Sequence, residues 1–342
     1  MRLMFHDRIP TVYADNCDRR KEQVMDFYRI QNYFSKQLQQ ALLIWLKQDR
    51  RLEEIRLRVN RPLFIRYGGQ ESMIDKRGDI TTKEIDAVKI SGNDLQEIFL
   101  KMSEYSFYAY EDEIRQGYLT TKEGCRVGIC GKVVCDSGKI KTIHHISSLN
   151  IRFPYENKGC SKWLLPYLFN ENQVEHTLII SPPMCGKTTL LRDLIKQLSD
   201  GSDSIDGKTV GVVDERGEIC ACHLGIPQND MGNKTDVLDG CPKVEGMMML
   251  VRTMSPEVIA VDEVGSKQEF DAMEYAMNCG CSILATIHGN HLEEVLHKNK
   301  TILEEKKSFF KRYLVLSRRN GAGTIEGIYD ENGHTIWKGK DI

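Results

Sequence analysis

The stretch from residue 176 to residue 198 joins a short apolar segment to a helical one through a turn that ends in Gly-Lys-Thr. His176–Ile180 is apolar, as expected for a buried strand, and Thr189–Leu198 has leucines at helical spacing. A strand that passes directly into a helix is the first half of a strand–helix–strand unit. The feature therefore predicts a sheet of parallel strands covered by helices.

Later segments continue the alternation of predicted strands and helices. Apolar strands are expected at residues 210–213, 258–261 and 282–287, and helices are expected near 244–253 and 268–278. The predicted fold class for this half is α/β, with a parallel, doubly wound sheet. Ligands of such sheets collect at the carboxyl ends of the strands.

The first half has a mixed pattern. Residues 1–50 are expected to be helical, because apolar side chains recur at helical spacing from Phe27 to Leu42. Residues 54–59 alternate between polar and apolar side chains, and residues 118–134 have the glycines of a small antiparallel hairpin. We expect an N-terminal α+β domain whose core includes Phe99, Phe107 and Tyr108. The predicted domains are 1–153 and 173–342, and the linker is 154–172, where Pro and Gly interrupt the periodicity.

Net charge and composition limit the classes of partner and the cellular compartment that we expect for this chain. The 342 residues carry a net charge of −2, which argues against a dedicated nucleic-acid binder, so nucleic acid is not an expected partner. No segment approaches the roughly 18–20 apolar residues of a membrane span, and the start lacks the apolar region of a secretion signal. The eleven cysteines are odd in number and lack paired zinc-site spacing, so we expect reduced thiols in a cytoplasmic protein and no zinc, with a redox or metal role as alternatives.

The Gly-Lys-Thr triplet at 186–188 ends a P-loop pattern, Ser181–Thr188, and a second triplet at 207–209 serves as an internal control. Only the first follows a strand and opens a helix, so only it can direct backbone N–H groups and a helix N-terminus at phosphate. We expect ATP and Mg²⁺ here, with Lys187 at the β/γ-phosphates and the Thr188 hydroxyl on the metal. The alternative is a chance turn before a helix. The residues expected to bind the nucleotide are Pro183, Met184, Cys185, Gly186, Lys187, Thr188 and Thr189.

Ser181 departs from the P-loop pattern, which has Gly at this position. Glycine permits backbone angles that other residues avoid. We therefore expect a somewhat altered loop that still binds phosphate. Pro182 and Pro183 lie early in the loop, where the loss of an N–H donor matters less.

Carboxylates follow two of the predicted strands. The strand at 258–261 ends in Asp262 and Glu263, which predicts an Mg²⁺ ligand and a residue that activates the attacking water. After the strand at 210–213, Asp214 is expected at the metal and Glu215 near the water. The alternatives are a plain strand end for the first pair and a solvated turn for the second.

His288 ends the last predicted strand and could sense the γ-phosphate by a hydrogen bond, although a lone histidine is usually structural or solvated. Residues 219–243 have little periodicity. Loops of that length in a compact domain tend to be functional, so we expect a subunit-contact or substrate loop, or else an ordinary excursion.

Several of these segments resemble known families. Asp214–Glu218 resembles the acidic box of type II/IV secretion ATPases, and Thr286–His288 resembles their histidine box. More closely, the chain resembles the stage III sporulation protein AA family. The segments that carry this second resemblance are 53–58, 124–128, 182–193, 213–216, 227–230, 235–243 and 247–263.

The resemblance implies an ATP-hydrolysing motor of endospore-forming bacteria with a RecA-like core. It further implies a ring-forming homo-oligomer, a hexamer, at the cytoplasmic face of a membrane in the mother cell. Its partners would be integral membrane proteins of a sporulation channel complex. Within such a ring, Arg152 and Arg252 are candidates for charge compensation between subunits, with ordinary solvent exposure as the alternative.

One departure concerns the Asp262-Glu263 pair, because secretion ATPases commonly have Gly-Glu there. Two other functions stay open on the sequence alone. One is a nucleotide-gated assembly scaffold with little turnover. The other is a DNA-translocating ATPase, although the net charge of −2 argues against binding to DNA.

Overall fold

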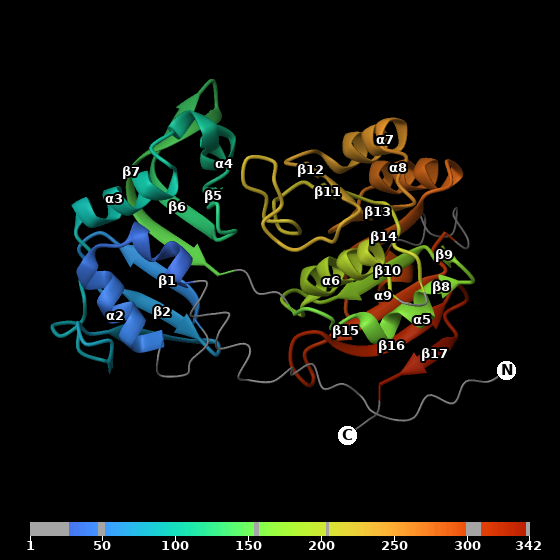
Figure 1. Ribbon diagram of the computed structural model, residues 1–342, viewed down its shortest axis with the longest axis horizontal. Coiled ribbons are helices and arrows are strands. Elements are labelled where there is room, and N and C mark those ends of the chain that lie inside the picture. Colours follow the sequence, from blue (N-terminus) through green and yellow to red (C-terminus); the bar gives the residue numbers. More distant parts are fainter. Residues whose placement is uncertain (1–26, 47–51, 154–156, 203–204, 299–308, 340–342) are drawn as a thin grey trace. The chain divides into compact units, whose positions relative to one another are not determined.

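The computed structural model describes residues 27–46, 52–153, 157–202, 205–298 and 309–339 (Figure 1). Of the helical prediction for residues 1–50, the parts at 1–26 and 47–50 lie outside the described residues. The chain forms two compact units that divide between Pro154 and Tyr155. In the described part of the chain, no helix has the length and apolar character to cross a bilayer.

The first unit is built on a seven-stranded antiparallel sheet with the order β4-β3-β2-β1-β7-β6-β5. Its strands are β1 Leu52–Arg58, β2 Phe64–Tyr67, β3 Gln70–Ile74, β4 Ile80–Thr81, β5 Tyr118–Thr120, β6 Arg126–Asp136 and β7 Lys139–Arg152. Its helices are η1 Gln31–Tyr33, α2 Lys36–Leu46, α3 Gly92–Met102, η2 Phe107–Tyr110 and α4 Glu111–Arg115. Ser91 and Asp94 form a capping box that starts α3, which explains why a helix begins there.

The predicted aromatic core of this unit is only partly right. Phe99 is buried, but Phe107 and Tyr108 are 45% and 91% exposed. The cause is local: Glu104 and Tyr105 both adopt positive φ after α3 ends, which turns the chain. Tyr110 then enters the core in place of its neighbours.

The second unit contains the predicted parallel sheet. Its order is β12-β11-β13-β14-β10-β15-β16-β17, parallel from β12 to β15 and antiparallel beyond. The strands are β10 Thr177–Ser181, β11 Val210–Asp214, β12 Thr235–Asp239, β13 Val258–Val261, β14 Ser282–His288, β15 Arg312–Ser317, β16 Thr324–Asp330 and β17 Thr335–Lys338. The helices are α6 Lys187–Asp200, α7 Lys243–Thr253, α8 Lys267–Asn278 and α9 Leu292–Lys298.

Helices cover both faces of this sheet, because alternate side chains of its buried strands point to opposite sides. Ile179 belongs to the core that includes the leucines of α6. Its neighbours Leu178 and Ile180 belong to the core that includes Met247 of α7 and residues of α8 and α9. The doubly wound arrangement predicted from the sequence is confirmed.

Two parts of the sequence prediction are wrong. Most of the predicted linker is folded: η3 Lys162–Leu164, α5 Leu165–Leu168, β8 Phe169–Asn170 and β9 Gln173–Val174 lie in it or at its end. Leu164, Leu165 and Leu168 are buried in the core beside α6, so burial of these leucines outweighs the Pro and Gly signals. The stretch 219–243 also contains β12, a half-exposed edge strand whose weak apolar pattern concealed it.

Candidate functional site

The predicted site residues lie at the carboxyl ends of β10, β11, β13 and β14, which share one edge because the strands are parallel. Pairing between strands sets their positions. Ser181 of β10 is opposite His288 of β14, and Val261 of β13 is opposite Ala285 of β14. The turn after β10 and the loop after β13 are therefore brought to opposite sides of the end of β14.

The loop between β10 and α6 has the features of a phosphate-binding turn. Gly186 has φ +85° and caps α6, and a Cβ there would lie 3.0 Å from the backbone N of Gly323. Met184 also has a positive φ of +60°. The N-terminus of α6, an element of 14 residues, is thus placed at the end of the loop.

Ser181 does not have the conformation that would demand glycine. It is the last residue of β10, fully buried, and is absent from the positive-φ residues of the chain. Its hydroxyl donates to the carbonyl oxygen of Pro182 at 2.8 Å. The sequence-based expectation of an altered loop at this position therefore finds no support in the backbone.

Three of the predicted catalytic side chains meet. The Lys187 Nζ donates to Glu263 Oε1 at 2.9 Å and lies 3.3 Å from His288 Nε2. His288 Nε2 lies 2.8 Å from the same Glu263 oxygen. Lys187 is 6% exposed, so this ammonium group is nearly enclosed by its polar partners.

Asp262 and Thr188 form the second contact across the site. The Thr188 hydroxyl donates to Asp262 Oδ2 at 2.7 Å, and Thr286 donates to the other Asp262 oxygen. Hydroxyl and carboxylate oxygens are ligands that Mg²⁺ accepts in nucleotide sites. The donor set of Thr188 and Asp262 therefore suits this metal, as the sequence predicts.

The backbone of Glu263 is unusual, because its φ of +55° is in the left-handed region. For a residue other than glycine this costs on the order of 1–3 kcal/mol and persists only where its surroundings enforce it. Its side chain is held as well: Arg216 Nη1 donates to Oε2 at 3.0 Å, opposite the oxygen bound by Lys187.

These contacts set the charge of Glu263. Burial raises the pKa of its carboxyl, but hydrogen bonds and charge from Lys187, with further help from His288, outweigh burial and hold the pKa below its ordinary value. In this arrangement Glu263 is an ionised but weakly basic carboxylate.

The carboxylate of Asp214, a predicted metal ligand, is engaged by hydrogen bonds. Both of its oxygens are used by the following loop: they accept from the backbone N–H groups of Glu218, Ile219 and Cys220 at 3.0, 3.0 and 2.8 Å. The side chain is 2% exposed, and burial raises its pKa to about 6 despite these donors. Asp214 is placed to fix the loop, and its role as a metal ligand stays a prediction.

Glu215 does come to the site, held by a residue that the sequence analysis missed. Lys243, the first residue of α7, lies 3.2 Å from Glu215 Oε2 and donates to Glu269 Oε1 at 3.0 Å. The sequence pattern does not single out Lys243, because this residue ends the loop expected at 219–243. Its position directly after Pro242, at a helix start, was the available signal.

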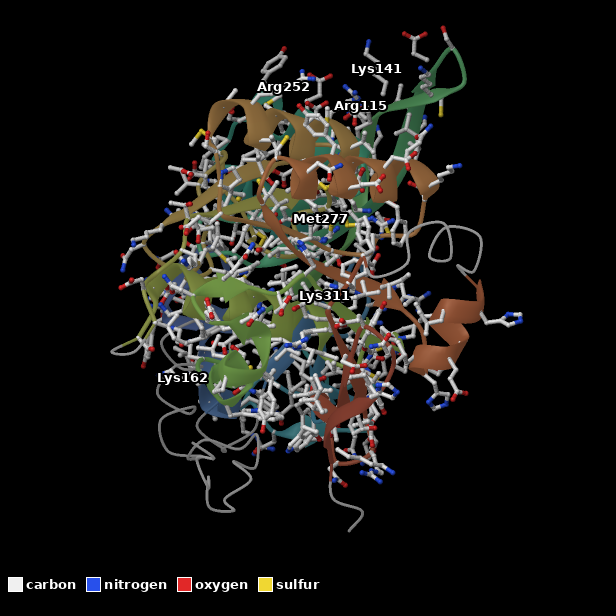
Figure 2. The ribbon with its side chains drawn as sticks, turned by 90° about the vertical axis from the view of Figure 1, so that its right-hand side faces the viewer. Arg115, Lys141, Lys162, Arg252, Met277 and Lys311 are labelled. Carbon is white, nitrogen blue, oxygen red and sulfur yellow. The ribbon has the colours of Figure 1, made fainter. Side chains whose placement is uncertain are left out.

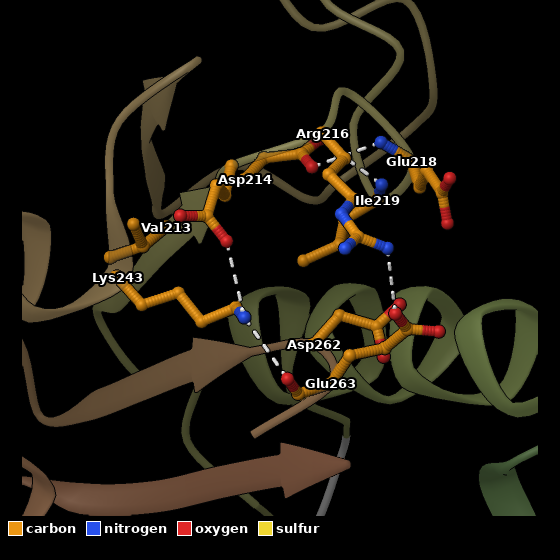
Figure 3. A pocket seen from close by; sticks show the side chains of 9 residues that line it. Val213, Asp214, Arg216, Glu218, Ile219, Lys243, Asp262 and Glu263 are labelled. Carbon is orange, nitrogen blue, oxygen red and sulfur yellow. Dashed lines mark hydrogen bonds and ion pairs between the residues drawn. The ribbon is translucent and has the colours of Figure 1, made fainter. Parts of the chain in front are cut away.

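A hollow of about 270 Å³, partly open to solvent, lies beside these groups (Figure 3). It is lined almost entirely by charged side chains from the ends of β11 and β13 and the start of α7. Its lining residues are Val213, Asp214, Glu215, Arg216, Glu218, Ile219, Lys243, Asp262 and Glu263.

The two arginines considered for contacts between subunits lie outside this cluster. Arg252 is exposed in the last turn of α7 (Figure 2). Arg152 is on β7 in the first unit and pairs with Glu54 Oε1 at 3.4 Å. Their interfacial role stays a prediction.

Comparison with known proteins now identifies the chain. The family described as "Sporulation stage III, protein AA" matches residues 19–336. The chain belongs to this family. It is 40% identical over 294 residues to stage III sporulation protein AA of Bacillus subtilis (strain 168). The aligned region covers 85% of this chain and 90% of the relative.

Solved structures with a similar fold include an ATPase and a pilus retraction motor. The ATPase DotB of Legionella pneumophila matches with a TM-score of 0.53 and 14% identity, over 95% of this chain and 83% of DotB. The pilus retraction motor PilT with bound ADP matches with a TM-score of 0.52 and 14% identity, over 77% of this chain and 74% of PilT. This chain thus shares the α/β P-loop fold of these proteins, as the sequence predicts.

Proposed function

We propose that this protein is an ATPase whose hydrolysis drives a ring-shaped motor during endospore formation. The observation that carries the proposal is the convergence of Lys187, Thr188, Asp262, Glu263 and His288 at the N-terminus of α6. Each group is of a type that phosphoryl transfer requires: a cation for phosphate, oxygens for a metal and a carboxylate for water.

Nucleotide binding would engage the loop first. The phosphates lie against the N–H groups of residues 185–189, and Lys187 turns from Glu263 to the β/γ-phosphates. Thr188 and Asp262 would hold Mg²⁺, which neutralises charge that develops on the phosphate oxygens. Asp214 would join this metal site only if its oxygens were released from the loop that follows it.

Hydrolysis then depends on Glu263. When Lys187 moves to phosphate, Glu263 loses the partner that contributes most to its lowered pKa, and its basicity rises. The carboxylate can then accept a proton from the attacking water. His288 lies at the end of β14, within hydrogen-bond distance of both Lys187 and Glu263. It is therefore placed to sense the γ-phosphate through a hydrogen bond.

The family and the fold support the proposed assembly. Membership in a sporulation family and likeness to secretion and pilus motors support a homo-oligomeric ring, a hexamer, peripheral to a membrane in the mother cell. Its partners would be integral membrane proteins of a sporulation channel, and residues 219–243 would contact a neighbouring subunit or the substrate.

The chain supplies its own control for testing the activity. ATP hydrolysis is measured for the wild type, for Lys187→Ala and for Lys208→Ala, which alters the second Gly-Lys-Thr triplet. We expect hydrolysis to fall to background only in Lys187→Ala, by about 100-fold or more. If the wild type binds ATP but hydrolyses it no faster than Lys187→Ala, a nucleotide-gated scaffold replaces the motor.

A further inference from the structure

The left-handed backbone of Glu263 needs partners that hold it, and its own peptide groups identify them. Its N–H donates to Thr286 Oγ1 at 2.9 Å, and its carbonyl oxygen accepts from Lys243 Nζ at 3.0 Å. A residue with a Cβ adopts φ +55° only at a cost in free energy. These two hydrogen bonds, one on each side of the residue, offset that cost.

Lys243 is placed to do more than satisfy one carbonyl. Its side chain is 11% exposed, and its ammonium group reaches the Glu263 carbonyl, Glu269 Oε1 and Glu215 Oε2 at 3.0, 3.0 and 3.2 Å. These oxygens come from the loop after β13, the first turn of α8 and the loop after β11. One buried cation therefore ties three elements to the start of α7.

Glu269 in turn is fixed by its own helix. Its second oxygen accepts from the backbone N–H groups of Gly265 and Ser266, as part of the capping box that starts α8. Lys243 thus joins the Glu263 carbonyl to an anchored carboxylate. Such a link transmits the position of α8 to the peptide of Glu263.

The other groups that hold Glu263 act on its side chain and have different duties. Lys187 is required by the phosphates in the proposed reaction, and the Arg216 side chain is 63% exposed and lies at the mouth of the site. Lys243 binds the backbone carbonyl of Glu263, whereas Lys187 binds its carboxylate, and the other partners of Lys243 are acids, which do not bind phosphate. Its contact can therefore persist when nucleotide binding draws Lys187 away.

We propose that Lys243 is a positioning residue for hydrolysis, which holds the Glu263 peptide in its left-handed conformation so that the carboxylate stays aimed at the attacking water. The inference rests on the proposed ATPase function. Lys243 does not contact the nucleotide; it acts only through Glu263.

The charge of Lys243 is secure for this role. Burial lowers its pKa, but hydrogen bonds to Glu269 and Glu215 and the charges of these acids outweigh burial, and the pKa is raised above its ordinary value. The side chain is protonated at every pH at which the enzyme would be assayed.

Lys208 provides a matched control for the test. Its side chain is also 11% exposed and also pairs with a glutamate, Glu257, at 3.1 Å, but it precedes β11 at the opposite edge of the sheet. Lys243→Met and Lys208→Met therefore remove the same group from equally exposed lysines, although Glu257 is 49% exposed and Glu269 is 15% exposed. Steady-state hydrolysis, affinity for a non-hydrolysable ATP analogue and thermal melting are measured for both.

We expect Lys243→Met to lower kcat by about 10- to 100-fold, the range that a small misplacement of a reacting group produces. Its affinity for the analogue should stay within about threefold, since no phosphate contact is lost. Lys208→Met should keep the kcat of the wild type, whatever its melting temperature. If Lys243→Met does not fold, Lys243→Gln, polar and of similar length, takes its place with the same criteria.

A second comparison tests whether Lys243 acts through Glu263. In the Glu263→Gln background, where the carboxylate is gone, Lys243→Met should slow a single turnover by less than about twofold. A full additional loss there, a kcat equal to that of the wild type in Lys243→Met, or the same loss of kcat in Lys208→Met would each overturn the inference. Failure of the ATPase proposal is separate, since it appears as a wild type no faster than Lys187→Ala.

Discussion

At the scale of single residues, Asp214 shows that an acidic residue at a strand end can stabilise the loop beside the site through hydrogen bonds to its backbone. Asp214 and Asp262 have similar positions in the sequence pattern: Asp214 is the last residue of the buried strand β11, and Asp262 directly follows the buried strand β13. Yet Asp262 meets Thr188, whereas Asp214 accepts three backbone N–H groups of its own loop. The difference is in the residues that follow, because the loop after Asp214 turns back over its side chain.

The pKa of Asp214 gives a prediction for stability. Because burial raises this pKa from an ordinary 3.8 to about 6, the folded state holds the proton more tightly than the unfolded state. The stability that Asp214 contributes is therefore complete below about pH 4 and is lost as the pH rises through 6, by up to about 3 kcal/mol. Unfolding by urea between pH 4 and 8 should show this decrease in the wild type.

Asp214→Asn is the control for that experiment, since an amide does not titrate. The difference in unfolding free energy between wild type and variant should shift in favour of the variant as the pH rises from 4 to 7. A difference that is constant over this range would contradict the assignment of the titration to Asp214.

Ser181 gives a second prediction at this scale. Ser181 is a buried strand residue without a positive φ, so replacement by glycine would relieve no backbone strain there. We expect Ser181→Gly to leave ATP hydrolysis within about twofold and to reduce the free energy of unfolding by about 0.5–1 kcal/mol, the entropic cost of glycine in a strand. A marked gain in hydrolysis would show that serine does distort the loop.

These residues also mark what the sequence could predict of the site. Strand ends and their order along the chain place Lys187, Asp262, Glu263 and His288 at one edge, and the structure brings these four together. The rotation of a side chain within a loop depends on later residues and on burial, which the pattern does not contain. For that reason the pattern does not show that Asp214 binds the loop that follows it, and it does not single out Lys243.

At the scale of elements, α6 links the site to the segments around it. Asp193, on this helix, accepts from the N–H groups of Gly159 and Ser161, both at 2.7 Å, and from the Ser161 hydroxyl. On the same helix Arg192 donates to the carbonyl oxygens of Glu218 and Ile219. The helix that opens at the P-loop thus also fixes the start of the second unit and the loop after β11.

Removing Asp193 tests this structural role. Asp193→Ala leaves buried N–H donors without their acceptor, and we expect a loss of about 2–3 kcal/mol in the free energy of unfolding. Affinity for ATP should change little, because no phosphate contact is removed. Lys196→Met, which breaks a pair with Asp200 at 2.7 Å near the surface of the same helix, should cost at most about 1 kcal/mol. Equal losses would argue against a special role for Asp193.

The elements that the sequence did not predict have weak patterns for physical reasons. β12 is an edge strand with half-exposed side chains, and β17 at the other edge is mostly exposed. The buried strands β10, β11, β13 and β14 read as continuous apolar runs and were all predicted. β15 is an exception, because it lies between β10 and β16 with buried side chains and was still not predicted, although Tyr313–Leu316 is an apolar run.

At the scale of the whole molecule, the candidate site belongs to one unit. Among the described residues, the side chains that form hydrogen bonds or ion pairs with the side chains of Lys187, Asp262 and Glu263 lie between residues 181 and 288, within the unit that begins at Tyr155. This unit has its own sheet and a core on each face of it. The first unit has a separate sheet and a separate set of buried side chains.

A fragment of residues 155–342 should therefore fold alone and bind the non-hydrolysable ATP analogue within about threefold of the affinity of the full chain. Turnover is the informative measurement. Arg152 lies outside this fragment, so if it compensates charge in a neighbouring subunit, the fragment should bind nucleotide normally but hydrolyse it about tenfold more slowly. Full-length Arg152→Ala should then show the same loss. A fragment that hydrolyses ATP at the rate of the full chain would instead show that the second unit contains every residue the reaction needs.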